Sequence, residues 1–271
     1  MKLIKTVIIF ILIALMSVFI ETAFAAGAPL DEKIISKIAK GEELGFMSFG
    51  DIDGDKKDEI IISINKLHAG QNNAPESKLA IFRGDKIIDI DAFSSYIEKL
   101  DLIDVDGDMA HEIVFSRNFG VNALIEVYVL KALKDYKTGL TSFHFILKSG
   151  GLYNGKYDII KNADGIVQII TGGYVNAPDS IAPHLEFSRF YSYDKKTGFL
   201  CLVKKFNERP RSVSQEYEYA YMLYIENDSA EAVKRLKNIL TGAKNAKSED
   251  NIQILKASEK LLSQIERVKK Q

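Results

Sequence analysis

The hydrophobic pattern changes its period twice along the chain. Residues 30–40 place Ile34, Ile35 and Ile38 on one face, which predicts a short amphipathic helix. From about residue 45 to residue 206, short segments rich in β-branched and aromatic residues alternate with Gly, Asn and Asp turns. This alternation is typical of antiparallel strands. We therefore predict a mainly β region there.

The helical period returns near residue 211. Apolar positions recur every three to four residues in 212–227, 228–242 and 248–271, which predicts three helices. Asp228 or Ser229 can cap the second helix, and Gly242 can end it. The change of period predicts a β domain over residues 26–210 and a helical C-terminal region over residues 211–271.

The first 25 residues have the pattern of a cleavable signal peptide. Lys2 and Lys5 precede an apolar run over residues 7–20, and the small residues Ala23 and Ala25 suit a cleavage site. An uncleaved anchor is the alternative, although the run is shorter than the roughly 20 residues that a spanning helix needs. We expect a periplasmic or secreted protein with no membrane span in the mature chain.

Composition and charge exclude several classes of function. The 46% hydrophobic content is that of a globular chain, and a formal net charge of −1 gives no electrostatic footprint for nucleic acid. Cys201 is the only cysteine, so the chain forms no internal disulfide. Walker, nucleophile-elbow, HExxH and CxxC motifs do not occur in the sequence.

Two loops carry carboxylates at alternate positions and run directly into a β-rich segment. Counted from the first acid, positions 1, 3, 5 and 9 are occupied by Asp51, Asp53, Asp55 and Glu59 in one loop and by Asp104, Asp106, Asp108 and Glu112 in the other. Four carboxylates that face one point repel each other unless a cation lies between them. Ca²⁺ takes six to eight oxygens, and the position-7 carbonyls of Lys57 and Ala110 can add to the set. Solvated Asp-Gly hairpin turns without metal are the alternative.

The two acidic loops lie 53 residues apart, and a weaker third copy follows. In "IIKNADGIVQIIT", Asn162 and Asp164 occupy positions 3 and 5 and Gln168 position 9, with Ile160 in place of the first acid. A period of about 50 residues that carries several strands is typical of a blade or an array. We therefore predict about three repeated β units.

These loops are not EF-hands, because position 12 is Ile62 or Phe115 and the flanks are β-rich. "FGDIDGDKKDEIII" and "DVDGDMAHEIVF" instead resemble the FG-GAP and VCBS repeats of the integrin α-chain type of β-propeller. The resemblance implies propeller-like antiparallel blades with calcium-binding loops and a non-catalytic binding role. Lys56 and Met109 depart from it, because that family usually has Gly there.

Three functions remain open on the sequence alone. The leading interpretation is an exported, calcium-stabilised, non-catalytic binding or scaffold protein for a protein or glycan partner. The second is an extracytoplasmic hydrolase or lyase that draws its acids and bases from residues such as Asp179, His184 and Glu186. The third makes the helical C-terminal region the element that docks a partner.

Overall fold

The computed structural model describes residues 42–66, 76–84, 86–120, 124–135, 138, 141–162, 164–242 and 248–268. The predicted signal peptide and the predicted helix over residues 30–40 lie outside these residues. The described strands are β1 (Glu42–Gly50), β2 (Glu59–Lys66), β3 (Glu76–Arg83), β4 (Lys86–Phe93), β5 (Tyr96–Ile103), β6 (Glu112–Asn118), β7 (Leu124–Lys134), β8 (Thr141–Lys148), β9 (Leu152–Lys161), β10 (Val167–Tyr174), β11 (Glu186–Asp194) and β12 (Phe199–Asn207). The helices are α3 (Val213–Ile225), α4 (Ser229–Gly242) and α5 (Glu249–Val268).

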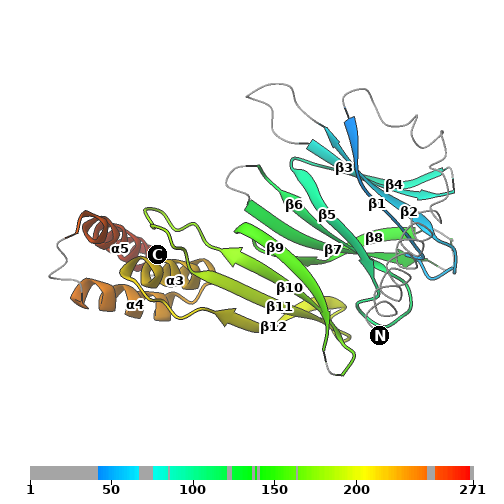
Figure 1. The fold of residues 1–271 in the computed structure, drawn as a ribbon. Helices are drawn as coiled ribbons and strands as arrows, with labels where there is room; N and C mark the ends of the chain where they lie inside the picture. The colour runs from blue at the N-terminus through cyan, green and yellow to red at the C-terminus, as the bar shows by residue number, and fades with distance from the viewer. Residues whose placement is uncertain are drawn as a thin grey trace, which may run out of the picture.

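Consecutive strands pair with one another in three groups of four. Strands β1 to β4 form a separate antiparallel sheet, and β5 to β8 and β9 to β12 each pair in chain order in the same way. We call these three groups units 1, 2 and 3. Figure 1 shows the sheet of unit 1 at one end of the molecule and the helices at the other.

Units 2 and 3 share one eight-stranded sheet. The link is short, because β7 pairs with β9 only through Leu124 with Tyr153 and Ile125 with Leu152. The prediction of a mainly β fold with antiparallel sheets and C-terminal helices is confirmed. The described residues form neither a closed barrel nor a closed propeller, because this pairing merges two units into one sheet instead of leaving separate blades.

The apolar faces of neighbouring units pack on each other. One buried cluster joins unit 1 to unit 2, with Ile61 and Ile81 against Ile113 and Phe115. A second buried cluster joins side chains of unit 2, such as Val129, to side chains of unit 3. Each unit therefore buries apolar side chains against the next, which a four-stranded meander cannot do alone.

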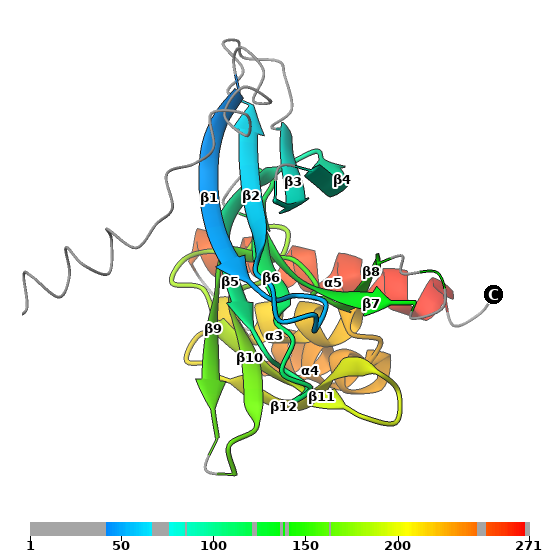
Figure 2. The same cartoon turned by 90° about the vertical axis from the view of Figure 1, so that its right-hand side faces the viewer.

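The three helices pack against unit 3. Figure 2, which looks from the unit 1 end, shows them behind the sheets. Ser212 caps α3, because its hydroxyl accepts a hydrogen bond from the backbone N–H of Gln215. The carboxylate of Asp228 accepts a hydrogen bond from the N–H of Glu231, so Asp228, and not Ser229, caps α4. One buried cluster combines helix residues such as Leu236 with Phe187 of β11, so the helices and unit 3 share a core.

Glu226, at the C-terminal end of α3, ties the helices to the outer strands of unit 3. Its carboxylate accepts hydrogen bonds from Arg189 of β11 at 2.5 Å and from Lys205 of β12 at 2.6 Å. Burial acts to raise the pKa of Glu226, but the bonds from Lys205 and Arg189 outweigh it and hold the pKa below its ordinary value.

We expect Glu226→Gln to lower the free energy of unfolding by about 1–2 kcal/mol at pH 7, because two cations lose their carboxylate partner. A carboxyl whose pKa is lowered in the folded state stabilises the protein above its unfolded pKa, near 4.5, and this contribution disappears as the pH falls through the folded value. Urea unfolding from pH 7 to pH 3 should therefore show the wild type and the variant converging in acid. A difference that stays constant would contradict this assignment.

Candidate metal site in two acidic loops

The two acidic loops occupy equivalent places in units 1 and 2. The first runs from Gly50, the last residue of β1, to Glu59, the first residue of β2. The second runs from Ile103, the last residue of β5, to Glu112, the first residue of β6. Because each loop joins the first two strands of a four-stranded unit, the 53-residue spacing in the sequence matches the strand topology.

The position-1 acids hold both loops in the same backbone conformation. Asp51 accepts hydrogen bonds from the N–H groups of Gly54 and Lys56, both at 2.7 Å. Asp104 accepts from Gly107 at 2.7 Å and from Met109 at 3.1 Å. The residues that donate these bonds all have positive φ, between 65° and 82°. Lys56 and Met109 thus adopt a conformation that costs an L-residue about 1–2 kcal/mol and that Gly adopts freely.

The position-5 acids close the loops in the same way. Asp55 accepts from the N–H of Lys57, and Asp108 accepts from the N–H of Ala110, each at 2.9 Å. The structure therefore shows the N–H groups of Lys57 and Ala110 in hydrogen bonds within the loops. Their role as carbonyl ligands of an ion stays a prediction.

The glutamates at position 9 are buried and point back into the loops. Glu59 is 0% exposed and accepts from the N–H of Ile52 at 3.2 Å. Glu112 is 1% exposed and accepts from the N–H of Val105 at 2.8 Å. The equivalent bond in both loops fixes each carboxylate beneath the loop backbone.

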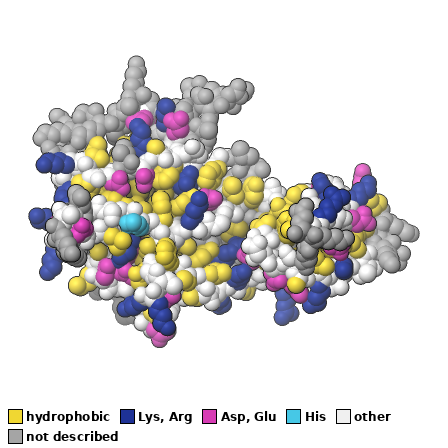
Figure 3. All heavy atoms as spheres, turned by 180° about the vertical axis from the view of Figure 1, so that it is seen from behind, with side chains coloured by type: hydrophobic (Ala, Val, Ile, Leu, Met, Phe, Trp, Pro, Cys, Tyr) yellow, Lys and Arg dark blue, Asp and Glu magenta, His cyan; other side chains and the backbone are white. Residues whose placement is uncertain are grey.

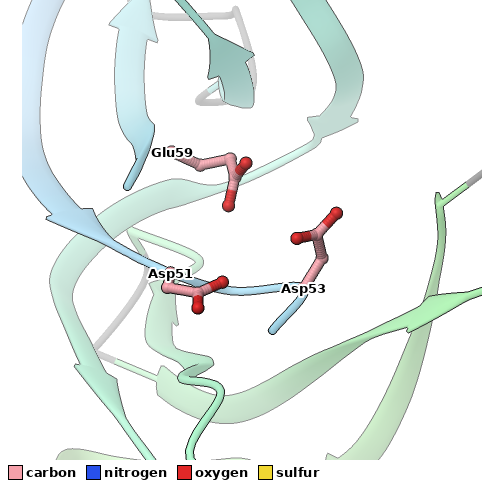
Figure 4. A group of neighbouring side chains, drawn as sticks. All are labelled: Asp51, Asp53 and Glu59. Atoms are coloured by element: carbon pink, nitrogen blue, oxygen red, sulfur yellow. The ribbon is translucent and has the colours of Figure 1, made fainter. Parts of the chain in front are cut away.

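Carboxylate oxygens converge in both loops. Those of Asp51, Asp53 and Glu59 lie within 4.8 Å of one another, and Figure 4 shows the three side chains directed toward one space. In the second loop the converging oxygens belong to Asp104, Asp106 and Asp108. Asp55 is not in the first cluster, and Glu112 is not in the second. Such sets of hard oxygen donors suit Ca²⁺ better than a softer metal.

Basic side chains from neighbouring strands already contact the first cluster. Arg83, at the end of β3, donates to Asp53 and also to Glu59, the latter at 2.8 Å. Lys134, at the end of β7, lies 3.2 Å from Asp53 and 3.7 Å from Asp55. Two cations, one from unit 1 and one from unit 2, thus neutralise this loop.

Lys131 of β7 has the same role in the second loop. Its Nζ donates to Asp106, to Asp108 at 2.7 Å and to Glu112 at 2.9 Å. The side chain is only 12% exposed, so one ammonium group is enclosed by three carboxylates. The three carboxylates need a cation between them, and the ammonium group of Lys131 is that cation.

The pKa shifts follow from these contacts. Burial lowers the pKa of Lys131, but the bonds to Asp106, Asp108 and Glu112 outweigh it and raise the pKa above its ordinary value. At Glu112 burial dominates and raises the pKa to about 7, against the bonds from Val105 and Lys131. Burial also acts to raise the pKa of Asp53, yet Lys134 and Arg83 together bring it below its ordinary value. The cations therefore keep the position-3 acid ionised in the first loop.

The third loop lacks this arrangement. Asn162 accepts from the N–H groups of Asp164 and Ile166, and Gly165 has φ +80°, as the position-4 glycines do. Because Lys56 and Met109 at position 6 also have positive φ, these features fit Asn162 at position 1 as well as at the predicted position 3. Val167 begins β10 and is paired with Lys161, as Glu59 is with Gly50 in unit 1. The acidic residue of that position is thus absent from unit 3.

In units 1 and 2 the acid at the start of the second strand has a basic residue beside it on the third strand, and unit 3 has neither. Glu59 and Arg83 each lie one residue beyond the paired Ile60 and Phe82. The corresponding residues of unit 3, one beyond the paired Gln168 and Ser192, are Val167 and Tyr193. Glu112 and Lys131 stand in the same relation in unit 2. An acid and a base are therefore present together in units 1 and 2 and replaced together by uncharged residues in unit 3.

Each acidic loop also contacts the following unit. The N–H of His111 donates to the carbonyl of Asp51 at 2.8 Å, and Thr141 donates to Asp53 at 3.2 Å. Tyr193 of β11 lies against Asp106, and burial together with that carboxylate raises the pKa of the tyrosine. The two loops thus serve as contacts between units.

Sequence reasoning missed the residues that neutralise the loops. Arg83, Lys131 and Lys134 lie on strands β3 and β7, and no local spacing relates them to the acids. The places of Arg83 beside Glu59 and of Lys131 beside Glu112 become visible only with the strand register. Lys134 reaches the first loop only through the packing of unit 2 on unit 1.

The residues named for a hydrolase or lyase do not converge on one pocket. Asp179 lines a small cavity of about 80 Å³ beside Tyr217, and neither His184 nor Glu186 lines it. His184 Nδ1 is 2.5 Å from a carboxylate oxygen of Glu218 on α3, a residue that the sequence analysis did not single out. This pair connects the helices to unit 3.

The surface and the helices add two observations. Figure 3 shows Lys and Arg interspersed with Asp and Glu over the face seen from behind, with no extended region of one sign. None of the helices in the described ranges combines the length and the apolar composition that a membrane crossing requires.

Searches against protein-family models and against curated proteins found no match for this chain.

Proposed function

We propose that this chain is an exported, non-catalytic binding or scaffold protein whose acidic loops hold Ca²⁺, with units 1 to 3 as repeats of the FG-GAP and VCBS type. The observation that supports it best is the equivalence of the two loops. Both converge hard oxygen donors on one point, in the same backbone conformation and at the same place in a four-stranded unit. The ions stabilise contacts between units, and a protein or glycan partner binds the resulting surface.

The second loop is the stronger site. A calcium ion there is held by Asp104, Asp106 and Asp108, and it displaces the Lys131 ammonium from Asp106 and Asp108 so that Lys131 keeps only Glu112 as its partner. The first loop has lower affinity because two cations, Arg83 and Lys134, contact its acids. The bound ion supplies charge neutralisation and loop rigidity, and it takes part in no chemical step.

Thermal unfolding with EGTA and with 10 mM CaCl₂ tests this proposal. Extracellular calcium modules have Kd values of about 10⁻⁴ to 10⁻³ M, so 10 mM Ca²⁺ stabilises each occupied site by about 1.4–2.7 kcal/mol. We expect the midpoint to rise by about 3–10 °C. Asp104→Asn keeps an acceptor for the loop N–H groups but removes a charge, and it should abolish most of this rise. Asp51→Asn should have the smaller effect.

Asp158→Asn is the matched control, because Asp158 is an exposed residue of β9 outside both loops. The control should respond to calcium as the wild type does. Equal midpoints of the wild type in EGTA, Ca²⁺ and Mg²⁺ would remove calcium from the proposed function. The loops would then be neutralised by Arg83, Lys131 and Lys134 alone.

A further inference from the structure

The helical region contains a cavity that is separate from the acidic loops. Its volume is about 860 Å³, and it lies between the segment that precedes α3, the first turn of α3, the length of α4 and the start of α5. This volume falls within the roughly 300–1,000 Å³ of typical ligand sites. Residues of the two acidic loops do not line it.

The cavity has an excess of positive charge. Its two acids are already neutralised, because Glu216 accepts from Arg235 at 2.9 Å and Glu231 lies 3.1 Å from Lys234 and 3.3 Å from Arg235. Arg211 is exposed at the edge of the cavity, and its guanidinium makes no hydrogen bond or ion pair with any described residue. One strong, geometrically defined donor thus remains for an anionic group.

The remaining lining suits a polypeptide better than a bare inorganic ion. Asn238 on α4 and Asn251 on α5 line the cavity, and their side-chain amides have no hydrogen-bond partner among the described residues. An amide offers both a donor and an acceptor and so matches a peptide bond. Val213 and Ile239 provide apolar contact between these polar groups.

We propose that this cavity binds a short acidic peptide segment of a partner protein. A carboxylate of the peptide pairs with Arg211, and its backbone amides bond to Asn238 and Asn251. This second site goes beyond the calcium-dependent function, because none of its groups contacts an acidic loop. It makes the helices, as well as the β units, a recognition element.

Fluorescence anisotropy with a fluorescein-labelled, end-capped tetraglutamate peptide tests the proposal on the full chain in EGTA at low salt. We expect saturable binding that Arg211→Glu weakens by at least about tenfold, through loss of one charge-assisted pair. A tetraglutamine peptide should bind more weakly by a similar factor. Asn238→Ala should weaken binding by about threefold to tenfold, through loss of a neutral hydrogen bond.

Lys256→Glu is the matched control, because Lys256 is an exposed residue of α5 outside the cavity lining and the variant makes the same charge change. Its affinity should stay within about twofold of the wild type. Absence of saturable binding, or equal losses in Arg211→Glu and Lys256→Glu, would overturn the proposal. Citrate that displaces the peptide at equal affinity would also overturn it, because a free polycarboxylate would then be the ligand. Binding in EGTA keeps the result independent of the calcium test.

Discussion

Lys131→Met is expected to lower the free energy of unfolding by about 3 kcal/mol in EGTA. The variant keeps most of the apolar stem but removes the ammonium group from Asp106, Asp108 and Glu112. Removing one partner of a buried ion pair commonly costs about 3–5 kcal/mol, because the opposite charge stays buried without compensation. The lower end applies here because the side chain of Asp108 is 48% exposed.

Calcium should recover most of this loss. With Lys131 replaced, none of the basic side chains in the described ranges is paired with Asp106, Asp108 or Glu112, so the stabilisation by 10 mM Ca²⁺ should be larger in Lys131→Met than in the wild type. Urea unfolding with EGTA and with calcium measures both quantities, and Lys256→Met on the exposed side of α5 is the control. A variant that unfolds like this control in EGTA would contradict the role of Lys131. Destabilisation without recovery would leave that role intact and argue against calcium.

Glu218→Ala is expected to cost about 3–5 kcal/mol and to loosen the helices from unit 3. The carboxylate is fully buried on α3, where it lies 2.5 Å from His184 Nδ1 and accepts from the N–H of Leu185 at 2.6 Å. Substitution leaves the buried N–H of Leu185 and the half-buried ring of His184 without an acceptor, and a hydrogen bond to a charged group contributes about 1.5–3 kcal/mol. Urea unfolding followed by circular dichroism measures the loss.

Glu259→Ala is the matched control, because Glu259 is an exposed helical residue of α5. Hydrogen exchange of α3 amides adds a local measurement. Faster exchange throughout α3 in Glu218→Ala, and not in the control, would show that the helix has separated from unit 3. Stability within about 1 kcal/mol of the control would contradict the structural role of the His184–Glu218 pair.

Short-range patterns predicted much of the fold. The β-rich segments, the three helices and the place of each acidic loop follow from periods of two and about 3.6 residues and from Asp-Gly turns, all of which act between near neighbours. The cap at Asp228 follows for the same reason. The two loop clusters themselves were found because Asp51 and Asp53, or Asp104 and Asp106, are close in the sequence.

Contacts between distant strands could not be read from those patterns. The prediction of propeller-like blades did not anticipate the pairing of β7 with β9, which depends on two residues of each strand and joins units 2 and 3. The third loop is shorter than the first two, and only the strand register reveals that Val167, and not Gln168, takes the place of Glu59 and Glu112. The basic partners of the loops were missed for the same physical reason, since Lys131 is opposite Glu112 only across a strand pair.

The order of pairing within each unit has a consequence for biosynthesis. Almost every strand hydrogen-bonds to the strand before or after it in the chain, so the loops that must close are short and the entropy lost in closing them is small. Each meander can form once its own stretch of about 50 residues has emerged, and the next can add to it. The helices follow unit 3 in the chain and cover Phe187, so this apolar surface stays exposed on the ribosome until the helices have emerged as well.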